Sequence, residues 1–160
     1  MPNLLSRSTR RSLILPLPLR TTLLFFRGET SWRAPNRGNF KINCDVALPV
    51  GGRAGTVACL MRDDAGILVD GLTKPCRANS SLAGELSAIR EACLMVASLN
   101  IQGCTVESDC RQGILLSASE LVPPWEVSGL VRDIRRVARD KRVEFSWVRA
   151  SPTAWAVGAP

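Results

Sequence analysis

The hydrophobic pattern of this chain changes its period near residue 80, and that change limits the possible fold more than any other feature. Upstream, Phe40, Ile42 and Cys44 alternate with polar residues, which is the period of two expected of a β-strand. Downstream, apolar residues recur every three or four positions, which is the period of an amphipathic helix. A helix that follows several strands can bury its apolar stripe against their sheet, so we expect an α/β domain.

The rest of the pattern predicts the order of all the elements. Turns at 51–52 and 63–66 separate the first strands, and Ser80 or Ser81 can cap the helix that follows. The predicted segments are strands at 40–45, 56–61 and 67–72, a helix at 82–99, a strand at 103–108, a helix at 109–117, a helix that begins at 123–125 and a strand at 143–147. The order β-β-β-α-β-α-α-β predicts a mixed five-stranded sheet flanked by helices.

Composition fits one globular domain. The chain has 160 residues, of which 46% are apolar and 22% are charged. No apolar run approaches the ~18 residues of a membrane span, so we expect no membrane partner. Six cysteines never reach C-x-x-C spacing and histidine is absent, which removes the usual zinc ligands. We expect six reduced thiols, mostly buried, in a reducing compartment.

Residues 1–31 form a basic leader. Five of the 21 basic residues lie within 1–28, which contain no acid, so the remaining chain has 16 basic and 14 acidic residues. The net charge of +7 is therefore weak support for nucleic-acid binding. The composition fits an organellar transit peptide and equally a leader without function. We expect an intracellular protein, mitochondrial or plastid in the first case and nuclear or cytoplasmic in the second.

Three carboxylates fall at the boundaries of predicted elements. Asp45 closes the first strand, Glu85 lies one turn into the first helix, and Asp109 follows the fourth strand. Mg²⁺ prefers oxygen ligands, and two such ions roughly 4 Å apart can clamp the attacking and leaving oxygens of a phosphodiester. We therefore expect the three side chains to meet in a metal site. If they do, mutual repulsion without metal should raise the pKa of at least one of them.

Each acid also has an ordinary structural explanation. Asp45 can be a solvated residue at a strand end, and Glu85 can complement the dipole of its helix. Asp109 can cap the next helix, with Gln112 completing a capping-box-like pair. The joint placement of the three acids favours the metal site over three separate explanations. Trp125 is expected to pack as a hydrophobic anchor at a helix start, with base stacking as the alternative.

The order of the motifs resembles the ribonuclease H-like domain, in the plant form related to non-LTR retroelement ribonuclease H. The resemblance covers about residues 32–148, which we take as the domain. The matching pieces are W-R-A-P-N-R-G-N-F-K-I-N-C-D, R-D-D-A-G-I-L-V-D-G-L, S-S-L-A-G-E-L-S-A-I-R-E-A, V-E-S-D-C-R-Q, P-P-W-E-V-S-G-L-V-R-D-I and F-S-W-V. Each piece is weakly specific, whereas the ordered set is strongly specific.

The resemblance implies hydrolysis of the RNA strand of an RNA–DNA hybrid by an endonuclease that uses Mg²⁺ or Mn²⁺. It implies that Asp45 bridges two ions and that Glu85 and Asp109 each help to hold one. Weaker candidates for substrate contact beside this site are Asn43, Arg111 and Gln112. We expect the domain to act as a monomer.

The segment 149–160 departs from the family pattern. The family places a fourth carboxylate on a final helix, but no Asp, Glu or Asn follows Glu144 here. We therefore expect a degenerate or missing final helix and a weakly held second ion, and the divergent segment suggests truncation or an altered reading frame. Two alternatives to the enzyme stay open: a nucleic-acid-binding module with little or no catalysis, and a non-functional retroelement-derived fragment.

Overall fold

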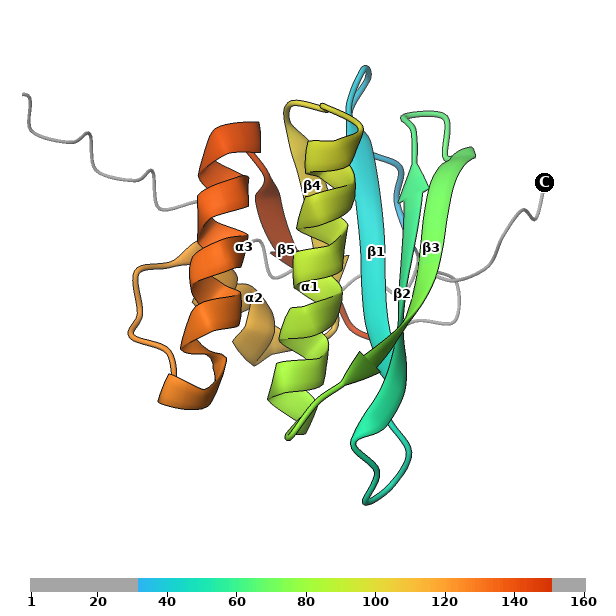
Figure 1. Cartoon of the computed structure of the whole chain (residues 1–160). Coiled ribbons are helices and arrows are strands. Elements are labelled where there is room, and N and C mark those ends of the chain that lie inside the picture. Colours follow the sequence, from blue (N-terminus) through green and yellow to red (C-terminus); the bar gives the residue numbers. More distant parts are fainter. Residues whose placement is uncertain (1–31, 151–160) are drawn as a thin grey trace, which may run out of the picture.

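The computed structural model describes residues 32–150, which form a five-stranded sheet with helices packed on it (Figure 1). The element order is the predicted one. The elements are β1 (Phe40–Ala47), β2 (Ala54–Arg62), β3 (Leu68–Arg77), α1 (Ser81–Ser98), β4 (Cys104–Ser108), α2 (Arg111–Ala118), the 3₁₀ helix η1 (Trp125–Val127), α3 (Ser128–Lys141) and β5 (Glu144–Trp147). The fold class and the mixed sheet inferred from the sequence are therefore confirmed.

The ends of several elements differ from the prediction, most clearly the end of β3 and the start of α3. β3 continues to Arg77 because its pairing with β2 extends to Ala54↔Arg77. Pro75 is tolerated within it because β3 is an edge strand and needs no donor on its free side. The helix predicted from 123–125 begins as η1 and becomes α3 only at Ser128, because Val127 (φ −113°, ψ 2°) leaves the helical region.

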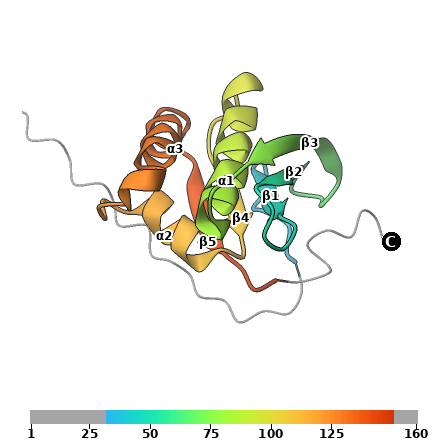
Figure 2. The same cartoon turned by 60° about the horizontal axis from the view of Figure 1, so that its bottom comes forward.

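The sheet has the strand order β3-β2-β1-β4-β5. β1 runs antiparallel to β2 and parallel to β4, so it lies at the centre with neighbours of both directions. α1 and α3 lie side by side (Figure 1), and α2 lies beside β5 near the start of α1 (Figure 2). The carboxyl ends of the parallel strands β1 and β4 consequently lie close to the first turns of α1 and α2.

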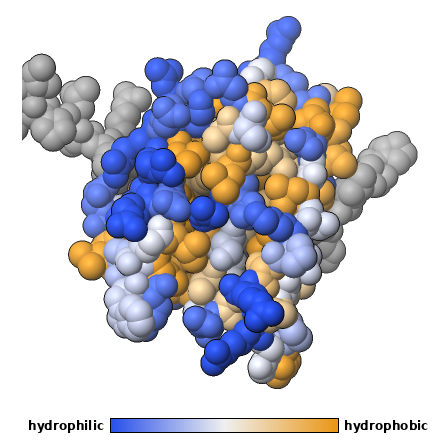
Figure 3. Space-filling model, in the orientation of Figure 1, coloured by the Kyte–Doolittle hydropathy of each residue, from blue (hydrophilic) through white to orange (hydrophobic). Residues whose placement is uncertain are grey.

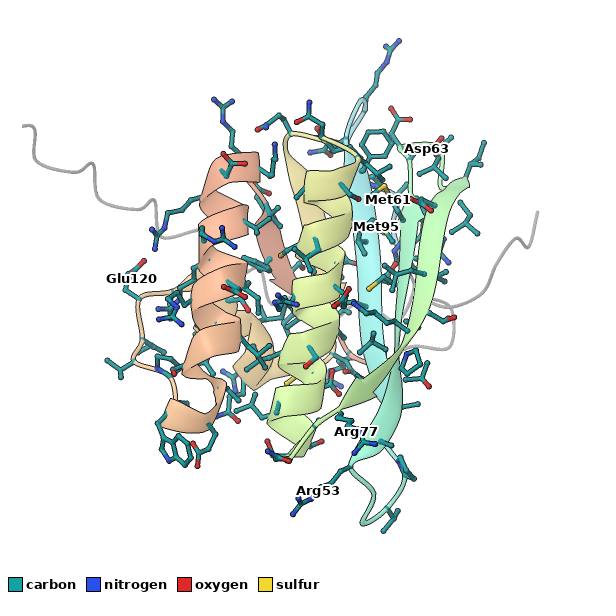
Figure 4. The ribbon with its side chains drawn as sticks, in the orientation of Figure 1. Arg53, Met61, Asp63, Arg77, Met95 and Glu120 are labelled. Atoms are coloured by element: carbon teal, nitrogen blue, oxygen red, sulfur yellow. The ribbon has the colours of Figure 1, made fainter. Side chains whose placement is uncertain are left out.

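The core lies between the sheet and α1. Ile42 and Cys44 of β1 meet Leu86 and Ile89 of α1, and all four are at most 2% exposed. Farther along the same interface, the apolar core includes Met61 of β2 and Met95 of α1, which are labelled in Figure 4. All six cysteines lie within the described residues, and four of them are buried, which confirms the expectation that most are buried.

The solvent side of α3 is strongly polar. Arg132, Arg136 and Arg139 recur at helical spacing and are exposed. Hydrophilic side chains crowd this side of the molecule in Figure 3. Because Val131 and Ile134 on the opposite stripe are buried, α3 is amphipathic.

Residues 1–31 and 151–160 lie outside the described part of the chain. The predictions of a basic leader and of a degenerate final helix fall on those segments. None of the helices within residues 32–150 combines the length and apolar character that crossing a bilayer requires.

Candidate metal centre

The site forms where β1 and β4 part. Their parallel pairing ends at Asn43↔Glu107. Asp45 and Asp109 each lie two residues beyond that last pair, so they occupy equivalent positions on two neighbouring segments of the chain. Side chains two residues apart on a strand share a face. Asp45 therefore faces away from the core residue Cys44, toward the side on which Asn43 lies.

The third carboxylate comes from α1. Ser80 caps the helix by accepting a hydrogen bond from the Ala83 N–H, which fixes the first turn. Gly84 packs so tightly that a Cβ there would lie 2.7 Å from Leu48 Cδ1 and 3.2 Å from Val46 Cγ1. The missing side chain lets α1 approach the end of β1 closely. Glu85, the next residue, thereby reaches the carboxylates of the two strands.

Asp45, Glu85 and Asp109 each place a carboxylate oxygen within 4.8 Å of the others. Asp45 and Glu85 are half-buried, whereas Asp109 is exposed. Glu85 Oε2 is buried and finds no hydrogen-bond partner among residues 32–150. A buried carboxylate oxygen without a donor is costly unless a proton or a cation satisfies it. The donor set therefore fits a hard divalent cation.

The electrostatics of the cluster agree with this interpretation. Burial, followed by the negative charges of Asp45 and Asp109, raises the pKa of Glu85 to about 7. Burial and the charge of Asp45 also raise the pKa of Asp109. The expectation that at least one acid has a raised pKa is thus confirmed. A bound cation would reverse this effect by favouring the ionised carboxylates.

Backbone contacts hold Asp109 in place. The indole Nε1–H of Trp147 donates to the Asp109 carbonyl at 2.9 Å. The residue that caps α2 is Cys110, whose Sγ accepts from the Gly113 N–H at 3.3 Å. The alternative that Asp109 caps this helix, with Gln112 as its partner, is therefore wrong. Its carboxylate is left to face Asp45 and Glu85.

The three weaker candidates for substrate contact differ in their exposure to solvent. Arg111 and Gln112 are exposed in the first turn of α2, directly after the site. Asn43 is only 2% exposed, and its amide group bonds to Arg62 and Glu107. Its contacts are with protein groups rather than with solvent.

Trp125 contradicts its prediction. The side chain is 81% exposed, so it does not anchor the helix start in the core. Val127, two residues later, is 2% exposed and fills that role. The 3₁₀ geometry of η1 changes the direction of the side chains from that expected for a regular helix.

Three positions that matter for the site escaped sequence reasoning. Gly84 had no signal beyond being a glycine inside a helix. Glu107 looked like an ordinary strand residue but is 6% exposed. Trp147 was recognised only as part of an alternating strand.

Comparisons with known proteins agree with this geometry. The model of the reverse transcriptase-like family matches residues 43–156. A search of curated protein sequences gives no match. Similar solved structures include the N-terminal RNase H domain of a Mycobacterium tuberculosis protein, solved as a maltose-binding-protein fusion. Its TM-score is 0.64 at 14% identity, with 74% of this chain and 87% of that one covered.

Two further RNases H1 have the same fold. RNase H1 of the archaeon Halobacterium salinarum gives a TM-score of 0.60 at 14% identity, covering 72% of this chain and 87% of its own. An RNase H1 isolated from compost, solved in complex with an RNA/DNA hybrid, gives 0.58 at 10% identity, covering 71% and 86%. The chain has the ribonuclease H-like fold and belongs to the reverse transcriptase-like family.

Proposed function

We propose that this chain is a divalent-metal-dependent endonuclease that hydrolyses the RNA strand of an RNA–DNA hybrid, acting as a monomer. The observation that carries the proposal is the meeting of three carboxylates from β1, α1 and the end of β4 within 4.8 Å. The compost RNase H1 of the same fold was solved with an RNA/DNA hybrid bound, which supports this class of substrate.

Asp45, Glu85 and Asp109 would hold Mg²⁺ or Mn²⁺, with Asp45 shared between two ions and the second ion weakly held. When bound, such ions supply an activated water and neutralise the charge that develops on the phosphate. Glu85 must be ionised to act as a ligand, and its pKa of about 7 makes metal and proton compete for it. Arg111 and Gln112, exposed beside Asp109, are placed to contact phosphate or sugar oxygens.

The test is cleavage of a labelled RNA–DNA hybrid by purified protein, in Mg²⁺ or Mn²⁺ and in EDTA. Asp45→Asn should abolish both cleavage and metal-linked thermal stabilisation, because it removes the shared ligand. Asp140→Asn is the matched control, since it makes the same charge change at an exposed position near the end of α3. Equal cleavage and equal metal response in wild type and Asp45→Asn would refute the proposal.

A second candidate is a nucleic-acid-binding module with little or no catalysis, or a retroelement-derived fragment without function. The observation that favours it is the number of ligands, because within residues 32–150 the site gathers three acids, one of them exposed. A binding module would retain hybrid affinity without metal-dependent cleavage, whereas a fragment would show neither. If the chain is an enzyme, adding a final helix that carries an aspartate, as in the family, should raise the rate of hybrid cleavage, because it supplies a fourth metal ligand.

A further inference from the structure

A chain of buried polar groups crosses the sheet directly before the metal centre. Arg62 Nη1 donates to Asn43 Oδ1 at 3.0 Å, and Asn43 Nδ2 donates to Glu107 Oε2 at 2.9 Å. Lys41 Nζ forms an ion pair with Glu107 Oε1 at 2.8 Å. Asn43, Arg62 and Glu107 are 2%, 4% and 6% exposed. We call Lys41, Asn43, Arg62 and Glu107 the inter-strand polar network.

The network joins three strands at one level of the sheet. Arg62 lies on β2, Lys41 and Asn43 lie on β1, and Glu107 lies on β4. Asn43 and Glu107 are also the last register pair before β1 and β4 part. Their hydrogen bond therefore fixes the separation of the two strands at the last point where the backbone ladder still connects them.

The ring of Trp32 shields the cations of the network. It lies 4.9 Å from the Arg62 guanidinium and 5.5 Å from Lys41 Nζ. Lys41 Nζ also donates to the Arg33 carbonyl at 2.7 Å. Exclusion of water strengthens each of these polar contacts and makes an unpaired member costly. The network can therefore tolerate few other arrangements of β1 against β4.

Stability alone is a poor explanation for such a network. Burying charged groups costs solvation free energy, and apolar replacements of similar volume often stabilise a protein as well or better. The best-attested use of buried polar groups is to specify register. Here register has a chemical consequence, because a slip of one residue would turn Asp45 to the opposite face of the sheet.

We propose that the inter-strand polar network is a positioning device for the metal centre: the Asn43–Glu107 bond holds β1 and β4 at the spacing that brings Asp45 within reach of Asp109. The inference rests on the proposed function, since it assigns a role relative to the same three carboxylates. Asn43 and Glu107 are positioning residues, because they act on the ligands through the backbone two residues away.

The test exchanges the chemical groups of the Asn43–Glu107 bond. Asn43→Asp places two carboxylates face to face and should push the strands apart. Adding Glu107→Gln restores one amide and one carboxylate, so the bond reforms with the donor on the other strand. Mn²⁺ affinity, measured by titration calorimetry on folded protein without substrate, is the readout. The single variant should bind Mn²⁺ about 10-fold more weakly, and the double variant within about twofold of wild type.

The direction of the change in Mn²⁺ affinity distinguishes a positioning role from the direct electrostatic effect of an added carboxylate. An extra carboxylate near Asp45 would by itself tighten Mn²⁺ binding, so a single variant that binds as tightly as wild type, or tighter, would overturn the inference. A folded double variant that binds no better than the single would also overturn it. If Asn43→Asp does not fold, the double variant must fold and bind near the wild-type affinity, and weak binding by it would refute the inference.

A destabilising control separates positioning from general loss of stability. Ile134→Val, in the buried stripe of α3, removes a core methylene while leaving the network intact. Its Mn²⁺ affinity should equal that of wild type, and an equal loss in this variant would contradict positioning. Absence of Mn²⁺ binding by wild type would instead refute the proposed function and this inference together. Wild-type binding with no response to the exchange would refute the inference alone.

Discussion

Glu85→Gln should make the metal-free protein more stable at high pH. Burial and two neighbouring carboxylates raise the pKa of Glu85 to about 7, so the folded state disfavours its ionised form. Glutamine has nearly the same shape and carries no charge. The substitution therefore removes a repulsion that the folded protein tolerates only when Glu85 is protonated or bound to metal.

The size of the effect follows from the two pKa values. The folded value is about 7 and the ordinary value is 4.5. At roughly 1.4 kcal/mol for each pH unit between them, the upper limit is about 3 kcal/mol. Glu85 is half-buried, so water screens part of the repulsion, and we expect about 1–2 kcal/mol.

The sign fixes the pH window. Between pH 4.5 and about 7 the folded protein binds more protons at Glu85 than the unfolded chain does, so wild-type stability falls as pH rises through this range. Urea denaturation in EDTA, repeated from pH 4 to pH 8, measures this trend. The free energy of unfolding of Glu85→Gln should match that of wild type near pH 4 and exceed it at pH 8.

With Mg²⁺ bound, wild type should have a higher free energy of unfolding than Glu85→Gln, the reverse of the order in EDTA. A ligand that binds only the folded state adds about 2.7 kcal/mol at 100 times its dissociation constant, so Mg²⁺ should stabilise wild type and leave Glu85→Gln nearly unchanged. The control is Glu126→Gln, which removes a charge from an exposed position in η1. A stability difference between wild type and Glu85→Gln that does not vary with pH would refute the assignment of the raised pKa.

Four further outcomes are expected. Gly84→Val should cost about 1–3 kcal/mol and weaken Mn²⁺ binding, because its side chain would meet Leu48 and Val46; denaturation and calorimetry measure the two effects. Arg135→Ala should lower the free energy of unfolding by about 1.5–3 kcal/mol and speed proteolysis after residue 118, because Arg135 donates to the carbonyls of Leu116 and Leu121 and so holds the segment between α2 and η1. Arg136→Ala, at an exposed position, is its control. Trp125→Ala should change the unfolding free energy by less than about 0.5 kcal/mol, and a larger loss would restore the packing interpretation. Thiol titration of denatured, unreduced protein should count six free cysteines, and four or fewer would contradict this.

Periodic features of the sequence predicted most of the fold. Apolar residues alternate around Ile42 and recur every three or four positions around Leu86. Each repeat places another apolar residue on the same buried face, so the pattern indicates the element several times over. The proximity of the three carboxylates followed from the family resemblance and from their positions at element ends. Local reasoning was sufficient for the periodic features because the buried face of a strand or helix is set by its own sequence, whereas the meeting of the carboxylates also required the order of the elements.

The features that were missed depend on contacts between distant residues. The Asn43–Glu107 bond joins residues 64 positions apart, and nothing near either one signals the other. Trp125 was expected to pack in the core because an apolar residue at a helix start usually does. In the 3₁₀ turn, Val127 is the buried residue and Trp125 is exposed. A cap by Asp109 is the alternative that residue propensity offers for α2, but the chain turns one residue later and uses the Cys110 thiol.

The two edges of the sheet have a consequence for self-association. An unpaired edge strand offers a row of N–H and C=O groups on which another chain can add. On β3 that row is interrupted by Pro75, which has no N–H, and Lys74 beside it is exposed. On the other side, β5 has only four residues. Pro75 therefore shortens the continuous template that β3 offers, and β5 offers only four residues, so a strand added at either edge would pair over a limited length.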